Sequence, residues 1–159
     1  TDTILLSLIS NFLEVSSWKN NFVNKSFILS KKIIGIDEFI LKVNFFNNNS
    51  VKLINFSKID FPEEKIFKLY QLVSSLNKLC IKGSFLIDEK QKIVIYSYCL
   101  DKNFKYLNFH IPFQLIKNSL CEIENLSKKM SLGMHQILYT ESQIEYIEEC
   151  LLSETHGNA

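Results

Sequence analysis

The sequence predicts an α+β fold, in which an antiparallel sheet of about five strands has helices packed on it. The clearest sign is the run 38–46, where apolar and polar side chains alternate as in a strand with one buried face. A second sign is the stretch 62–100, which has the pattern of an amphipathic helix, a strand, a polar turn and another strand. The predicted order is helix, three strands, helix, two strands, helix and helix, and such grouping of strands between helices is typical of this class.

The first half of the chain predicts one helix and a three-stranded meander. Apolar residues recur at helical spacing from Ile4 to Leu13, which indicates an amphipathic first helix. Residues 18–26 are polar and rich in asparagine, so they predict a loop or a weak edge strand. The predicted strands are 27–34, 38–46 and 51–56, with a hairpin turn at 47–50 because asparagine tolerates the left-handed conformation.

The second half predicts a helix, a hairpin and two further helices. Pro62 with two glutamates after it is typical of a helix start, and the apolar stripe of this helix continues to Cys80. Strands at 84–87 and 92–100 follow as a hairpin, and the second of them is apolar on both faces. A helix is expected from Pro112 to about residues 131–133. The capping pattern at 140–143 predicts a last helix. We therefore expect a single domain at 1–152 and a fraying tail at 153–159.

Composition and charge exclude several classes of protein. The chain has 159 residues and a formal net charge of +1, which gives no reason to expect a nucleic-acid partner. All 18 basic residues are lysine, and the abundance of lysine, asparagine and isoleucine indicates an AT-rich genome as the main cause. The apolar stretch that begins at Ile4 is interrupted by Ser7 and Ser10 and lacks a basic segment before it, so neither a signal peptide nor a membrane span is predicted. We expect a cytoplasmic protein without membrane insertion.

No motif in the chain commits it to catalysis, a metal or a cofactor. The four cysteines, Cys80, Cys99, Cys121 and Cys150, are too far apart for a zinc knuckle or a redox dithiol. Each lies in an apolar segment, which favours buried free thiols in a reducing compartment. The histidines lie at unrelated places, and His110 is expected to pack or cap a helix. The acidic cluster of Glu145, Glu148 and Glu149 is interpreted as a solvated helix face. The sequence therefore predicts that the protein is not an enzyme and uses no cofactor.

The feature that points to a function is a surplus of aromatic residues. These residues lie on and just after the last predicted strand, in a polar context: Tyr96, Tyr98, Phe104 and Tyr106. Tyrosine is enriched at protein interfaces because it combines a large contact area with a hydrogen-bonding tip. We expect these residues to form a protein interface, with Tyr96 and Tyr98 on the outer face of the sheet. The alternative is that two of them cover the core beneath the third helix.

The middle of the chain resembles the type III secretion chaperone-like fold, and within it the YbjN family. The similar segments are the helix 69–77 with an asparagine near its end, the strand 83–88 with the pattern Gly-x-Phe-x-x-Asp, and the apolar strand 93–98. The resemblance extends roughly from Ile4 to Met130 and fits a branch from an AT-rich bacterium, such as a small-genome cyanobacterium. It implies the arrangement predicted above and a non-enzymatic, often dimeric module that chaperones or regulates another protein. It carries over no catalytic residues.

The leading hypothesis is thus a protein-binding module, chaperone-like or an assembly or regulatory factor, with a protein client of unknown identity or a second copy of the chain as its partner. One alternative is a small-molecule-binding regulator or an enzyme whose pocket lies between sheet and helices. Another is a permanent subunit of a larger assembly.

Overall fold

The computed structural model describes residues 3–46, 50–80, 82–100, 110–140 and 149. These residues form a six-stranded sheet with helices before its first strand, between its fourth and fifth strands, and after its last strand. The elements are α1 (Thr3–Val15), β1 (Lys19–Val23), β2 (Phe27–Ile34), β3 (Asp37–Phe45), β4 (Val51–Lys58), the short 3-10 helix η1 (Glu63–Lys65), α2 (Ile66–Leu79), β5 (Ser84–Asp88), β6 (Ile93–Leu100) and α3 (His110–Tyr139).

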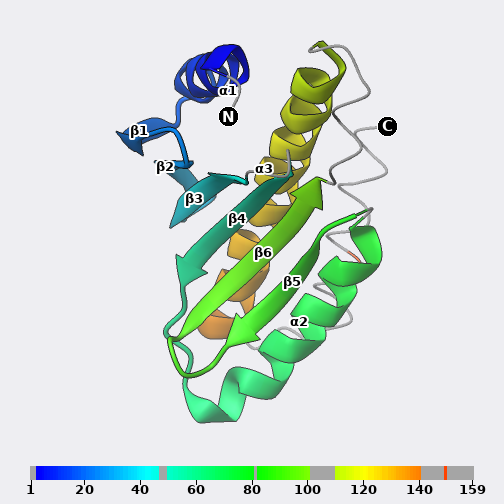
Figure 1. Cartoon of the computed structure of the whole chain (residues 1–159). Coiled ribbons are helices and arrows are strands. Elements are labelled where there is room, and N and C mark those ends of the chain that lie inside the picture. The colour runs from blue at the N-terminus through cyan, green and yellow to red at the C-terminus, as the bar shows by residue number, and fades with distance from the viewer. Residues whose placement is uncertain (1–2, 47–49, 81, 101–109, 141–148, 150–159) are drawn as a thin grey trace.

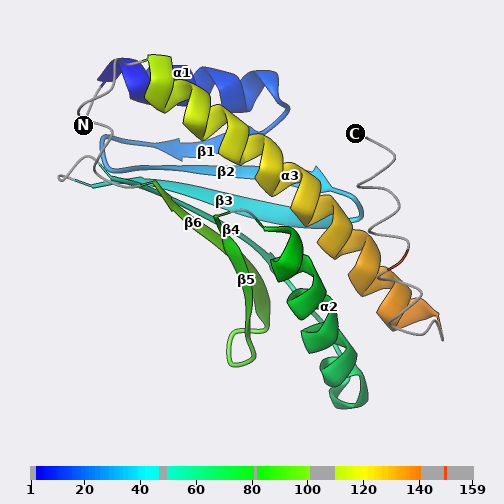
Figure 2. The ribbon, with the colours of Figure 1, turned by 90° about the vertical axis from the view of Figure 1, so that its right-hand side faces the viewer.

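All strands are antiparallel to their neighbours, in the spatial order β1-β2-β3-β4-β6-β5 (Figure 1). The order in space departs from the order in sequence where β6 lies between β4 and β5. Viewed from the side, α1, α2 and α3 all lie on the same side of the sheet (Figure 2). The protein is therefore a two-layer structure, with one face of the sheet against the helices and the other without a described helix on it.

The core lies between these two layers. Residues that alternate along β3, β4 and β6 point toward the helices and are buried, as β3 shows with Phe39, Leu41 and Val43 each 1% exposed or less. Leu69, Leu72 and Leu76 line the facing stripe of α2. The apolar stripe of α3 completes the core with Ile116, Leu120, Ile123, Met130, Met134 and Ile137.

The structure confirms the predicted α+β class and the antiparallel sheet, and it corrects one helix end. Residues 19–23 form a sixth strand at the sheet edge, so the edge strand is the correct one of the two alternatives for 18–26. Side-chain hydrogen bonds from Asn20 to Ser10 and from Ser30 to Asn20 hold this polar strand in place. The third helix does not end near Gly133 but continues to Tyr139. A Cβ atom at Gly133 would lie 2.8 Å from Leu72 Cδ1, so the glycine lets α3 approach α2 without displacing the Leu72 side chain.

The predicted last helix and the tail 153–159 lie outside the described residues, except that Glu149 is helical and exposed. The single domain at 1–152 stays a prediction for the same reason.

The edge strand β5 is fixed by one side chain of α2. The Phe85 backbone N–H donates to Asn77 Oδ1 at 2.6 Å, and Asn77 Nδ2 donates to the Phe85 carbonyl oxygen at 3.1 Å. Asn77 therefore takes the place of a neighbouring strand for one residue of an otherwise open sheet edge. Both bonds go to the backbone of residue 85, so they depend on the asparagine of α2 and not on the phenylalanine side chain.

Replacing Asn77 by alanine is expected to lower the free energy of unfolding by about 2 kcal/mol, because two half-buried backbone groups lose their partner. Urea denaturation followed by circular dichroism measures this change. The matched control is Asn118→Ala, since Asn118 is exposed on α3 and bonds only to Gln114 among the described residues. Equal effects of the two substitutions would contradict the role of Asn77.

Candidate protein-binding surface

The outer face of the sheet is the side on which no described helix lies (Figure 2). Strand register places one apolar row across four strands of this face: Ile40 pairs with Phe56, Phe56 with Ile95, and Ile95 with Leu86. Leu86 is 46% exposed, and the other three side chains of the row are partly exposed. We call these four residues the outer row.

Further apolar side chains surround the outer row on the same face. Ile54 lies beside it on β4, and Ile93 lies beside it on β6, both partly exposed. Ile33, at the end of β2, is 71% exposed. Single exposed apolar residues are common on proteins, but a contiguous group of them on a flat surface is typical of an interaction site.

Lysines also occupy this face, on four neighbouring strands: Lys19, Lys31, Lys42, Lys52 and Lys58. Lys19 and Lys31 are direct cross-strand partners, and Lys42 lies with its Nζ atom 4.8 Å from the centre of the Phe27 ring. Within the ranges that the structure covers, none of the five takes part in an ion pair. The acidic residues of the same face are Glu38 and Asp88.

The structure places Tyr96 and Tyr98 on the opposite, covered face. They are only 1% and 5% exposed, so they cannot contact a partner, and the expectation that they lie on the outer face is wrong. The alternative interpretation, that two of the aromatic residues cover the core, is the correct one for this pair. Phe104 and Tyr106, the other two predicted interface residues, lie outside the described residues.

Tyr96 has a packing role beneath α3. Its ring contacts the Phe85 ring edge to face, with centroids 5.0 Å apart, and its hydroxyl group occupies the space that a side chain at position 83 would need. Burial raises the pKa of Tyr96, and the nearby Glu122 carboxylate raises it further. Gly83 and Phe85, which carry part of the family resemblance, therefore accommodate this buried tyrosine.

One signal in the sequence did point to the outer face. Strand β6 is apolar on both sides, and Ile93 and Ile95 are the residues opposite to Val94 and Tyr96. The sequence alone does not say which of the two sides of β6 the helices cover. Because tyrosine is typical of interfaces, the side of Tyr96 and Tyr98 was predicted to be the exposed one, and that prediction is wrong.

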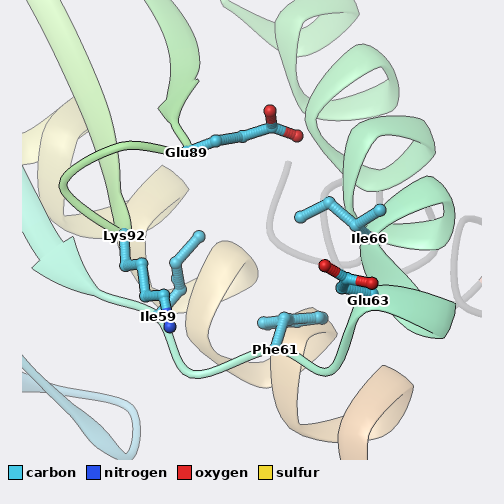
Figure 3. A pocket seen from close by; sticks show the side chains of 6 residues that line it. All are labelled: Ile59, Phe61, Glu63, Ile66, Glu89 and Lys92. Carbon is cyan, nitrogen blue, oxygen red and sulfur yellow. The ribbon is translucent and has the colours of Figure 1, made fainter.

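A pocket of about 510 Å³ lies at one end of the molecule, between the β5–β6 turn and the start of α2 (Figure 3). Ile59, Phe61 and Ile66 form its apolar wall, and Glu63, Glu89 and Lys92 contribute charged groups. A hydrogen bond from the exposed Tyr70 to the Glu89 carboxylate raises the pKa of Tyr70. Its apolar wall and charged groups make this pocket a candidate site for a small molecule.

The other candidate groups are scattered. His135 Nε2 lies 3.4 Å from Asp37 Oδ2, which is an ion pair only when the histidine is protonated. Among the described residues, no three side chains of the histidine, cysteine or acidic types come together as a metal site, and no helix is both long and apolar enough to cross a membrane. His156, Glu145 and Glu148 lie outside the described residues.

The thiols at Cys80, Cys99 and Cys121 are free. Burial raises the pKa of Cys80 to about 11, with a smaller contribution from the Glu122 carboxylate. Cys99 and Cys121 are exposed, so the prediction of buried thiols is wrong for these two, and Cys150 lies outside the described residues. Cys99 lies on the outer face, opposite Lys52, and Cys121 lies on α3.

At pH 8 only about one Cys80 thiol in a thousand is ionised, so iodoacetamide is expected to modify Cys80 at least about tenfold more slowly than Cys99 and Cys121. The rate at Cys80 should rise with pH up to about 11, because the thiolate is the nucleophile. Peptide mapping by mass spectrometry gives the three rates, and modification in urea serves as the control in which they converge. Similar rates in the folded protein would contradict the burial of Cys80.

Comparison with known proteins supports the fold and goes no further. No protein-family model matches the chain, and no curated protein matches it in sequence. Among solved structures, the chain is similar to the crystal structure of YbjN from E. coli, described there as a putative transcription regulator. The TM-score is 0.56 at 11% sequence identity, and the match covers 78% of this chain and 89% of YbjN. The YbjN-like fold is therefore shown, in agreement with the resemblance that the sequence predicts.

Proposed function

We propose that this protein is a non-enzymatic protein-binding module of the cytoplasm, chaperone-like or an assembly or regulatory factor, which holds a protein client on the outer face of its sheet. The observation that carries this proposal is the outer row: four apolar side chains on four adjacent strands, with no described helix over them. An apolar surface of this kind is stabilised when a partner removes it from water.

The likeness to YbjN supports the proposal at the level of the fold. A regulator that acts by holding another protein is one form of the proposed function, and regulation is the role suggested for YbjN. The client is a different protein or a second copy of this chain, and measurement of mass in solution distinguishes the two.

Replacing Ile40, Phe56 and Ile95 together by threonine is expected to abolish client binding while the monomer stays folded. Threonine keeps the preference for a strand but removes most of the apolar surface from the outer row. Affinity purification of the tagged protein from its native lysate, with mass spectrometry of what co-elutes, measures the loss. Light scattering of the purified protein shows whether self-association is lost at the same time.

The matched control is the substitution Val15→Thr, because Val15 is 85% exposed but lies on α1, away from the outer face. It should leave every co-eluting protein in place. A partner that is still bound at full stoichiometry by the triple variant, with an unchanged circular dichroism spectrum, would refute binding through the outer row.

A second candidate function is the binding of a small molecule in the pocket shown in Figure 3. An apolar wall with a few charged groups around it is typical of ligand sites. A metabolite that raises the melting temperature of the wild type but not of the Glu89→Ala variant would favour this function. The Lys90→Ala variant is the control, since Lys90 lies in the same turn but does not line the pocket. Absence of any such metabolite would leave the outer face as the functional surface.

A further inference from the structure

We infer that the segment which binds the outer face is an acidic protein segment that also carries apolar side chains. This inference rests on the proposed function and names the chemistry of the client. It follows from the lysines that surround the outer row. The net charge of the whole chain is only +1, so this local excess of positive charge does not appear in the total.

Lysine side chains lie beside the outer row on the same face of the sheet. Lys31 continues the outer row on β2, next to Ile40, and Lys42 and Lys58 lie on β3 and β4 in the neighbouring rows. An apolar strip with lysines beside it is complementary to a segment that has apolar side chains in its middle and carboxylates on its flanks.

The described acidic residues of the outer face are fewer than its lysines. On the covered side, Glu124 pairs with Lys32 at 2.8 Å, so that cation is neutralised within the protein. On the outer face the lysines have no ion-pair partner in the ranges that the structure covers, and they outnumber Glu38 and Asp88. The free protein therefore presents uncompensated positive charge on this face of the sheet.

Protection of a sheet edge explains only one of these lysines. Lysine on an edge strand blocks unwanted pairing with another sheet, which accounts for Lys19 on β1. Lys42 and Lys52 lie on β3 and β4, which have a neighbouring strand on both sides, so there is no open edge for these lysines to protect. Lys19 and Lys31 are direct cross-strand partners of like charge, an arrangement that costs free energy until an anionic group lies between them.

The aliphatic character of the outer row favours a protein over a nucleic acid. Single-stranded nucleic acids bind to sheets on which aromatic side chains stack with the bases. Three of the four side chains of the outer row are aliphatic, and Phe56 is its one aromatic member. A further aromatic pair of this face, Phe22 and Phe27, is stacked with ring centroids 5.2 Å apart on β1 and β2, away from the row. The face also has no arginine, since the chain contains none, and arginine is the residue best suited to bidentate contact with phosphate.

The test uses a fluorescein-labelled helical peptide with leucine along one face and glutamate on both sides of it, and a second peptide in which glutamine replaces every glutamate. Fluorescence anisotropy measures the affinity of each for the full chain. We expect the glutamate peptide to bind, to bind more weakly as salt rises, and to bind at least about tenfold more tightly than the glutamine peptide.

Two variants with the same loss of charge provide the comparison. Replacing Lys31, Lys52 and Lys58 by glutamine should weaken binding of the glutamate peptide about tenfold and leave the glutamine peptide unaffected. The control variant replaces Lys82, Lys90 and Lys128, which are exposed but do not lie on the outer face, and should bind as the wild type does. In addition, the bound peptide should protect Cys99 from iodoacetamide while Cys121, on α3, remains reactive.

Equal affinity for the two peptides, equal loss in the two lysine variants, or no binding of either peptide would overturn the inference. So would tighter binding to a single-stranded oligonucleotide or to phosphatidylserine vesicles than to the glutamate peptide. The proposed function fails separately: if the threonine variant of the outer row loses its natural client and the outer lysine variant keeps it, the face binds protein and the client segment is not acidic.

Discussion

The burial of the sheet on one side only is the constraint on which the rest of the structure depends. Alternation along β3 and β4 assigns Leu41, Val43 and Leu53 to the interior, and their neighbours in sequence to the other face. Since α1, α2 and α3 all pack on the same side, no element in the described part of the chain covers the remaining face. The alternation of side chains along the strands thus determines both the core and the candidate binding surface. A shift of register by one residue would move the side chains of each to the opposite face.

The long helix α3 crosses this sheet, and polar contacts fix its position along the crossing. Glu124 accepts hydrogen bonds from Trp18 and Lys32, Ser127 accepts one from the buried Asn55, and Ser131 accepts one from the Ile36 backbone. These three residues of α3 are spaced by three and four, so they share one face of the helix. Apolar contacts alone would let the helix slide along the sheet, and hydrogen bonds with fixed partners define its register. At its last turn, Lys65 donates to the carbonyl oxygens of Ile137 and Leu138.

The sequence was sufficient for the fold class and most of the strands because their information is local. The alternation at 38–46, the asparagine turn and the proline before α2 each act within a few residues. The errors came from residues whose role depends on distant neighbours. Gly133 has the pattern of a helix end, yet it lies against Leu72 on another helix. The sequence of residues 18–26 allows a loop or a weak edge strand, and only the hydrogen bonds of Asn20 to the distant Ser10 and Ser30 decide for the edge strand.

The same distinction explains why the binding surface was assigned to the wrong side of β6. Tyr96 and Ile95 are both plausible contact residues in sequence, and only the path of α3 decides which of them is covered. A buried tyrosine also needs room for its hydroxyl group. Here Gly83, the residue before β5, provides that room, and β5 is the strand that pairs with β6 at the sheet edge. The lysines of the outer face are likewise ordinary one by one along the chain. They become a single feature only when antiparallel register brings β1, β2, β3 and β4 together, and at that point their charge is concentrated beside an apolar strip.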